Sequence, residues 1–193
     1  MRRGLALLAG PVLVAGLCHT AEAQVVGEVS PRVTDLVAGL FCAPPDSGRR
    51  EAPDTMSGWI HVPDEPIEML VFGNQAPTVL GLGFGVRFNL APGPDAQMRY
   101  TVTHPPMPPS GVTSQSWTNT LGGGMTDSAF FQFDVPAELQ PGDWSFTVEA
   151  DGETLFTMAF QVMKAEDLPA LADLCRDGSL LSDLRLPAAR TPL

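Results

Sequence analysis

The longest regular pattern in the sequence is an alternation of large apolar residues with smaller or polar ones between Leu80 and Leu90. Leu82, Phe84 and Val86 are separated by single glycines, and the alternation continues beyond them. A period of two residues puts alternate side chains on opposite faces of a strand. The run therefore predicts a half-buried β-strand whose large side chains, from Leu80 on, face a core. The glycines predict that a crossing segment, a bulge or solvent lies against the other face.

A second pattern predicts a β-hairpin. Large residues occupy every second position from Trp144 to Ala150 and again from Phe156 to Val162, and the pair Asp151-Gly152 lies between the two segments. An Asp-Gly pair favours a type I′ turn, because both central residues of that turn have a positive φ.

Further short strands are predicted at residues 33–42, 56–62, 98–103, 116–121 and 131–135, the last with Phe131, Phe133 and Val135 directed inward. Residues 44–55 read as a polar loop punctuated by proline. The prolines of the run 104–109 have no N–H to donate to a ladder, so this run is expected to leave the sheet.

The period changes after Lys164, where the sequence predicts a short helix capped by Asp167 and ended by Gly178. One face of this helix would carry Leu168, Leu171, Leu174 and Cys175.

Short strands between turn residues, with 19 prolines and 19 glycines in the chain, predict an all-β fold. We expect an immunoglobulin-like antiparallel β-sandwich with a short C-terminal helix. A jelly roll or a small barrel is the alternative, because the pattern does not determine the strand order.

The first residues predict a cleaved signal peptide covering residues 1–23. Arg2 and Arg3 precede an apolar stretch that is too short to span a membrane, and the small-x-small motif at 21–23 suits a signal peptidase. The remainder is expected to form one domain at 24–178 and a flexible or loosely docked tail at 179–193. The predicted location of the protein is the periplasm or, if it is secreted, the outside of the cell.

Two other export signals are alternatives to this interpretation. Cys18 is the residue that a lipoprotein signal would acylate, but the bulky Leu17 precedes it. Arg2-Arg3 would suit a twin-arginine signal, but the residues that usually follow such a pair are absent.

Removal of residues 1–23 leaves Cys42 and Cys175 as the only cysteines. Two thiols in an oxidising compartment pair with each other in the absence of a third, so we expect a structural disulfide between them. The alternative, a redox pair or a thiolate metal site, lacks a C-x-x-C motif.

The net charge of −11 excludes two classes of partner. An acidic surface repels the phosphates of nucleic acids and the headgroups of anionic lipids. We therefore expect no nucleic-acid binding and no insertion into a membrane after the signal is removed.

No catalytic motif is present: the sequence lacks both G-x-S-x-G and H-E-x-x-H. Outside residues 1–23 the histidines are His61, for which a structural or exposed role is expected, and His104. The acidic group Asp64, Glu65 and Glu68 reads as a solvated turn. We therefore predict no enzymatic activity and no resident cofactor.

A metal site is the alternative hypothesis. His104 and Met107 lie three residues apart in a proline-rich segment, and an imidazole with a thioether suits copper. The competing interpretation is a rigid turn in which Met107 packs beneath the chain.

Four stretches together carry a resemblance to a known family: residues 39–42, 79–86, 103–107 and 141–146. In this order and spacing the chain resembles an alphaproteobacterial family of exported proteins, a domain of unknown function, over residues 33–176. The resemblance implies an exported domain and transfers no site residue.

The expected function is therefore a binding or structural role in the periplasm, with a protein or a small ligand as partner. The expected contact surfaces are the loops at 44–55 and 104–112 and the tail at 179–193, because loops on a rigid sandwich carry recognition.

Overall fold

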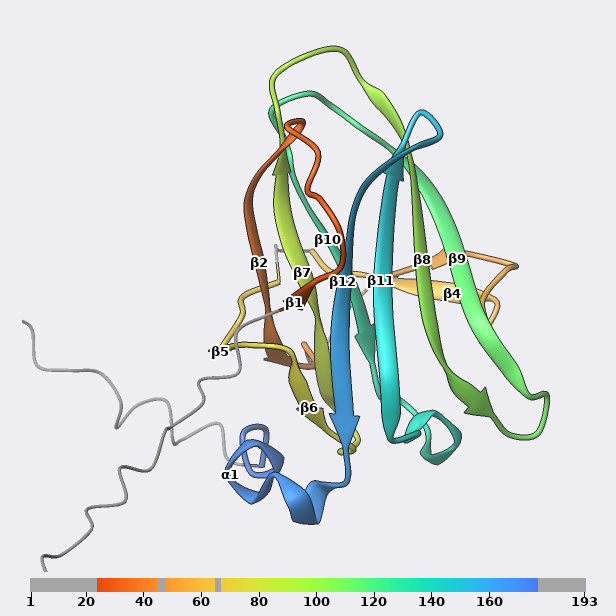
Figure 1. The fold of residues 1–193 in the computed structure, drawn as a ribbon. Coiled ribbons are helices and arrows are strands. Elements are labelled where there is room, and N and C mark those ends of the chain that lie inside the picture. The colour runs from red at the N-terminus through yellow and green to blue at the C-terminus, as the bar shows by residue number, and fades with distance from the viewer. Residues whose placement is uncertain (1–23, 45–47, 65–66, 177–193) are drawn as a thin grey trace, which may run out of the picture.

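The computed structural model describes residues 24–44, 48–64 and 67–176, which form two facing β-sheets (Figure 1). The larger sheet has the order β1 (Gln24–Val25), β12 (Glu153–Met163), β11 (Gly142–Ala150), β8 (Ala96–Met107) and β9 (Val112–Leu121), and β6 (Gln75–Pro77) pairs in parallel with β12. The smaller sheet has the order β10 (Thr126–Gln132), β7 (Leu82–Leu90), β2 (Val33–Cys42) and β5 (Val71–Phe72). A separate hairpin consists of β3 (Gly48–Glu51) and β4 (Trp59–Val62).

The order of the strands is that of an immunoglobulin-like sandwich. The chain runs through β2 and β7 in one sheet, crosses to β8 and β9, returns to β10, and crosses again to the β11–β12 hairpin. The central pairs are thus β7 with β2 and β10, and β11 with β8 and β12. This Greek-key arrangement confirms the predicted fold class, and the sheets do not close into a barrel.

The predicted strand β7 provides the centre of the core. Leu82, Phe84, Val86, Phe88 and Leu90 are all buried between the sheets, as their alternation predicts. The ring of Phe84 lies within 5.3–5.8 Å of the rings of other core aromatics: Phe133, Trp144, Phe146 and Phe160. The expectation for Leu80 is wrong, because β7 begins two residues later and Leu80 is 47% exposed.

The β11–β12 hairpin confirms the predicted turn. Asp151 and Gly152 have φ angles of 55° and 85°, and Ala150 pairs with Glu153 across them. The turn is held to the neighbouring strand because Asp151 Oδ1 accepts a hydrogen bond from the Gln97 amide, 3.0 Å away.

Two predictions about loops are wrong. Residues 48–51, within the predicted polar loop, form β3 and pair with β4. Strand β8 continues through the proline run as far as Met107 instead of ending at Thr103. Pro105 and Pro106 are tolerated there because the ladder with β9 is interrupted between Thr103 and Met107, so the missing N–H groups remove no regular ladder bond.

The inward alternation predicted for residues 131–135 holds only in part. Phe133 is fully buried, but β10 ends at Gln132 and Val135 is 43% exposed. Beyond this point the chain turns into a 3₁₀ helix, Pro136–Glu138.

The predicted C-terminal helix is shorter than expected. The α-helix α1 spans only Pro169–Ala172 and follows a 3₁₀ helix at Ala165–Asp167. Leu168, not Asp167, precedes the first turn, because Pro169 can start a helix but its ring disfavours a helical residue before it. Gly178, the predicted signal peptide at residues 1–23 with Cys18, and the predicted tail at 179–193 lie outside the described residues.

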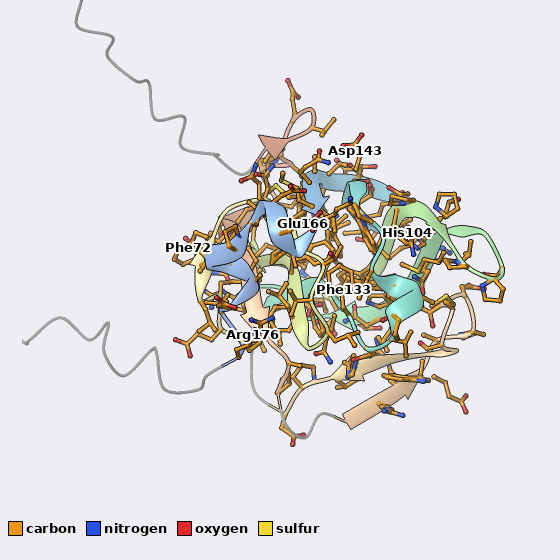
Figure 2. All side chains as sticks on the ribbon, turned by 90° about the horizontal axis from the view of Figure 1, so that it is seen from below. Phe72, His104, Phe133, Asp143, Glu166 and Arg176 are labelled. Carbon is orange, nitrogen blue, oxygen red and sulfur yellow. A yellow bond between two sulfur atoms is a disulfide. The ribbon has the colours of Figure 1, made fainter. Side chains whose placement is uncertain are left out.

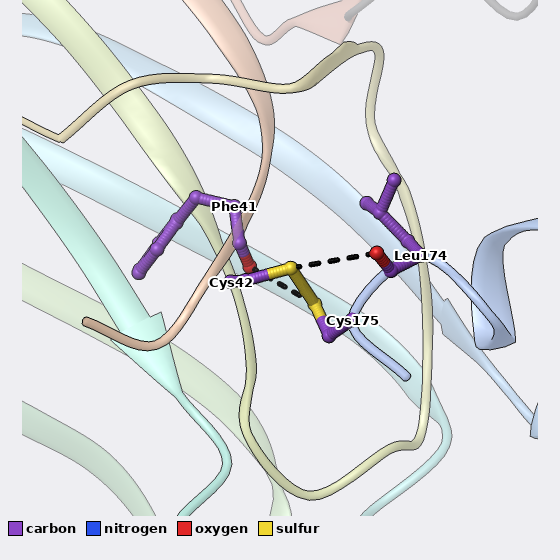
Figure 3. Close-up of a disulfide and its surroundings, with 4 residues drawn as sticks. All are labelled: Phe41, Cys42, Leu174 and Cys175. Carbon is purple, nitrogen blue, oxygen red and sulfur yellow. Dashed lines mark hydrogen bonds between the residues drawn. A yellow bond between two sulfur atoms is a disulfide. The ribbon is translucent and has the colours of Figure 1, made fainter. Parts of the chain in front are cut away.

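A disulfide joins the end of β2 to the segment after α1, as Figure 3 shows. The Cα atoms of Cys42 and Cys175 are 5.4 Å apart, and the two residues are separated by 133 positions in the sequence. The bond therefore closes most of the domain into one loop. Among the described residues, no helix has the length and apolar character needed to cross a membrane.

Candidate ligand-binding cleft

The β3–β4 hairpin lies along one side of the sandwich, where Figure 2 shows it at a distance from the main body of the sheets. We refer to residues 48–62 as the strap. On the β9 side, the amide of Ser116 donates to the carbonyl of Asp54 at 3.2 Å, and the amide of Met56 donates to Gln115 Oε1 at 2.7 Å. The strap is thus fixed to one edge strand of the larger sheet.

The other attachment of the strap is to the segment that follows β10. His61 Nε2 and Asp134 Oδ2 are 2.7 Å apart, and the imidazole is mostly covered. Since β10 is the edge strand of the smaller sheet, the strap spans the gap between the edges of the two sheets.

A cleft of about 410 Å³ lies between the strap and the two edge strands. Its volume is in the range of sites for small organic molecules. The apolar part of its lining includes four aromatic residues, Trp59, Trp117, Phe130 and Phe131. The ionisable part consists of Arg50, His61, Asp64, Asp127, Asp134 and Glu138.

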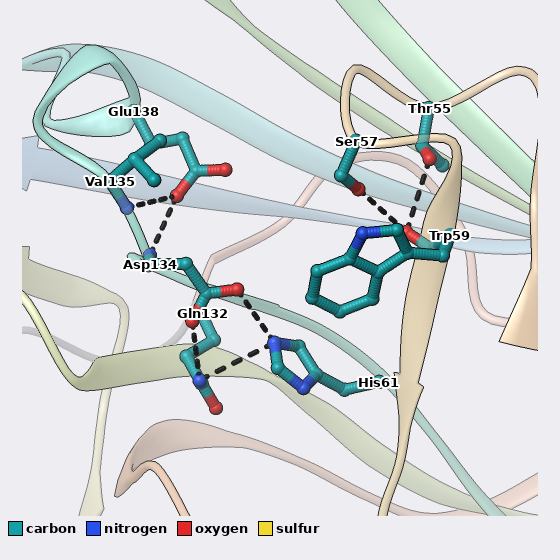
Figure 4. Close-up of polar contacts among 8 residues, drawn as sticks. All are labelled: Thr55, Ser57, Trp59, His61, Gln132, Asp134, Val135 and Glu138. Carbon is teal, nitrogen blue, oxygen red and sulfur yellow. Dashed lines mark hydrogen bonds and ion pairs between the residues drawn. The ribbon is translucent and has the colours of Figure 1, made fainter. Parts of the chain in front are cut away.

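One end of the cleft contains a cluster of polar groups, drawn in Figure 4. Gln132 Nε2 donates to Asp134 Oδ1 at 2.7 Å, which orients the amide because a carboxylate can only accept. The opposite atom, Gln132 Oε1, is buried and has no hydrogen-bond partner within the described part of the chain. A buried acceptor without a donor is an unfavourable feature that a bound ligand can relieve.

Glu138 is the buried acid of this cluster, only 7% exposed. Its Oε2 accepts hydrogen bonds from the amides of Asp134 at 2.6 Å and Val135 at 3.1 Å. Burial raises the pKa of the Glu138 carboxyl, and these two amide donors oppose the rise. Figure 4 shows the second carboxylate oxygen directed away from the two amides.

The opposite end of the cleft is organised around Asp127. The hydroxyl of Tyr100 donates to Asp127 Oδ2, and Asn119 Nδ2 donates to the same oxygen at 3.1 Å. Burial, with the adjacent carboxylate, raises the pKa of Tyr100 far above its ordinary value. The ring of Trp117 stacks on that of Tyr100 with centroids 5.5 Å apart, so one face of the indole is fixed from behind.

Trp59 on the strap already carries a cation. The guanidinium of Arg49 lies 3.8 Å from the centroid of the indole, in a cation–π contact. The imidazole of His61 meets the same indole edge to face at 4.8 Å.

The structure brings the predicted copper ligands His104 and Met107 together. Neither lines the cleft, but both contact Gln115, which does. His104 Nδ1 lies 2.8 Å from the Pro105 carbonyl, to which it donates. Its Nε2 therefore accepts from Gln115 Nε2 at 3.0 Å, and the same amide nitrogen lies 3.9 Å from Met107 Sδ. Burial lowers the pKa of His104. No group of three or more His, Cys, Asp or Glu residues suited to a metal ion occurs in the described ranges.

Of the two predicted contact loops, one contributes to the cleft and the other does not. Residues 44–55 contribute Arg50 and Thr55 to the cleft, whereas none of residues 104–112 lines it. No sequence pattern identified Gln132, Asp134 or Glu138 as a site residue. The available signal was that Gln132 and Asp134 flank Phe133 shortly before Pro136, which marks a strand end.

Comparisons with known proteins identify a family. A family model described as a domain of unknown function (DUF3859) matches residues 29–162, which confirms that part of the predicted resemblance. Among solved structures, an immunoglobulin-like protein from Pseudomonas aeruginosa has 20% sequence identity and a TM-score of 0.42, covering 75% of this chain and 99% of its own. Among curated proteins, none matches the chain.

Proposed function

Because the chain belongs to the DUF3859 family, whose description assigns no activity, we propose a function from the cleft itself. The protein is a non-enzymatic binding domain that holds a small organic ligand between the strap and the sandwich. The observation that carries this proposal is a cleft of about 410 Å³ that combines an aromatic wall with a buried acceptor, Gln132 Oε1, that has no hydrogen-bond partner in the described part of the chain.

The arrangement of hydroxyl groups supports binding over catalysis. The Ser57 hydroxyl donates to the Trp59 carbonyl at 2.8 Å, and the Thr55 hydroxyl donates to the Ala52 carbonyl at 2.7 Å. Both hydroxyls line the cleft, yet both stabilise the turn of the strap. A serine or threonine nucleophile needs its proton directed at a base, which these hydrogen bonds oppose.

An exported location fits this role. An immunoglobulin-like sandwich closed by a disulfide is compatible with an oxidising compartment. The proposed signal at residues 1–23 would direct the domain to the periplasm, and the net charge of −11 favours a partner other than nucleic acid or an anionic membrane.

The test is native mass spectrometry of the protein taken from its own compartment, with a variant that fills the cleft. Ser128 lines the cleft from β10, so Ser128→Phe should exclude the ligand. Ser114 is exposed on β9 outside the cleft, so Ser114→Phe is the matched control. We expect an organic adduct on the wild type and on the control but not on Ser128→Phe. Equal adduct on all three proteins contradicts the proposal.

If no adduct survives purification, a fragment screen by NMR replaces the first readout. We expect some fragments to shift the indole N–H signals of Trp59 and Trp117, which line the cleft, and Ser128→Phe to abolish those shifts. A screen in which no fragment shifts either signal refutes a ligand cleft.

Copper binding is the second candidate, since His104 Nε2 and Met107 Sδ both contact the amide nitrogen of Gln115. A Cu(I) ion bound by both would have to displace that amide. The test is competition with a chromophoric Cu(I) chelator. Copper binding requires that His104→Ala and Met107→Ala each weaken the affinity, and unchanged affinity in both variants ends the hypothesis.

A further inference from the structure

The cleft offers acceptors where a ligand would lie. At its polar end, Gln132 Oε1 is buried and has no donor among the described residues, and the Glu138 carboxylate has one oxygen beyond the one that receives both backbone amides. Neighbouring donors in this cluster are already engaged, since Gln132 Nε2 donates to Asp134. A ligand that satisfies these acceptors must bring N–H or O–H groups.

The charge of the residues that line the cleft further restricts the class of ligand. The cationic groups of this lining are Arg50 and His61, and its acidic groups are Glu138 and three aspartates. With Glu138 ionised, the acidic groups outnumber the cations even when Arg49, which lies against Trp59, is counted with Arg50 and His61. Anions such as phosphates, sulfates and carboxylates are therefore repelled, and a positive charge is attracted.

The aromatic residues of the cleft lining, which form its aromatic wall, also favour a cationic ligand. A ring face attracts a cation through its quadrupole, and Arg49 above Trp59 shows one such contact, 3.8 Å from the ring centroid. Trp117, Phe130 and Phe131 supply further aromatic surface within the cleft. An ammonium group attached to a flat apolar body suits both the acceptors and the rings.

We propose that the ligand is a small primary or secondary organic amine in its cationic form, with its N–H groups directed at Glu138 and Gln132 and its apolar body against the aromatic wall. This inference rests on the proposed function, because it names the ligand class of the same cleft. Burial of the carboxylate strengthens a charge-assisted hydrogen bond relative to one in water.

The test uses three probes with one phenyl body and different charge: 2-phenylethylammonium, 2-phenylethanol and phenylacetate. Binding is followed from the indole N–H shifts of the full-length protein at pH 7. We expect the ammonium to bind at least about tenfold more tightly than the alcohol, and the carboxylate to bind most weakly. Equal or tighter binding of the alcohol or the carboxylate overturns the inference while leaving a ligand cleft in place.

Absence of binding by all three probes contradicts the inference as well, and the fragment screen then decides separately whether the cleft takes any ligand.

The variant Glu138→Gln keeps the shape and an acceptor oxygen but removes the charge. We expect it to weaken the ammonium by about tenfold and to leave the alcohol within twofold of wild type.

The matched control is Glu153→Gln, which removes the same charge from an exposed position on β12 and should change neither affinity. A loss of ammonium affinity equal to that of Glu138→Gln would assign the effect to net charge and refute the role of the cleft carboxylate. The three-probe series on the wild type remains decisive where Glu138→Gln does not fold.

Discussion

His61 Nε2 lies 2.7 Å from Asp134 Oδ2, and this contact joins the strap to the segment after β10. The two residues are 73 positions apart in the sequence. Gln132 donates to the other oxygen of Asp134, so the carboxylate connects the strap to the edge of the smaller sheet. The geometry of the cleft depends on this attachment and on the one to β9.

Removal of this contact should loosen the strap more than it destabilises the domain. We expect His61→Ala to lower the free energy of unfolding by about 1 kcal/mol, the usual value for a partly covered polar pair. Amide hydrogen exchange in β3 and β4 should accelerate, with little change in the core strands. Lys164→Ala, which breaks an exposed 3.6 Å pair with Glu166, serves as the control and should change neither quantity. Unchanged exchange of the strap in His61→Ala contradicts the attachment.

Gly83 is predicted to tolerate no side chain. A Cβ at this position would lie 2.1 Å from Cζ of Phe41, so Gly83→Ala must displace the ring. We expect a loss of about 1–3 kcal/mol in chemical unfolding, as for other overpacked cores. Gly93→Ala, where the nearest atom is 3.9 Å away, should be nearly neutral.

The double variant Gly83→Ala/Phe41→Leu distinguishes the cause. If the ring is responsible, the cost of Gly83→Ala should fall in the Phe41→Leu background, because the clashing atom is then absent. An equal cost in both backgrounds assigns the loss to the backbone of β7 instead.

Local sequence patterns correctly predicted the elements whose conformation depends on neighbouring residues. The alternation around Phe84 and the pair Asp151-Gly152 predicted β7 and the hairpin turn, because a pleated strand and a type I′ turn each depend on neighbouring residues. The two-residue period left open whether a crossing segment, a bulge or solvent lies against the glycine face, and the structure places the Phe41 ring against Gly83.

The residues that form the cleft could not be predicted from local patterns, because they meet only through the strand order of the whole fold. His61 meets Asp134 only because the Greek-key order brings the strap to the edge of β10. A short strand that pairs only with its hairpin partner, such as Trp59–Val62, gives no sign of what it will cover. The predicted end of the strand at Thr103 was wrong for a related reason. Pro105 cannot take part in a regular ladder, but it can lie in a strand where the ladder is interrupted. That interruption depends on the pairing with β9, which the local sequence does not specify.

Loss of the disulfide should destabilise the whole domain. Cys42 and Cys175 close a loop across 133 positions, for which the chain-entropy model gives about 5 kcal/mol. We expect Cys42→Ser/Cys175→Ser to lower the denaturant midpoint strongly while β7 and the hairpin remain folded in the absence of denaturant. A midpoint equal to that of the oxidised wild type contradicts a stabilising role. Reduction of the wild type should reproduce the variant, which controls for the serine side chains.

The buried carboxyl of Glu138 should make stability depend on pH in a defined direction. Burial raises its pKa in the folded protein above the ordinary value of 4.5, so the folded state binds this proton more tightly than the unfolded state does. Its favourable contribution is complete below the unfolded pKa and disappears as the pH rises through the folded pKa. In urea unfolding, wild type should therefore lose stability relative to Glu138→Gln as the pH rises from 4 toward neutrality, whereas Glu153→Gln should show no such change. A constant difference between wild type and Glu138→Gln over that range would contradict the raised pKa, because it would mean that the two backbone amide donors fully offset the effect of burial.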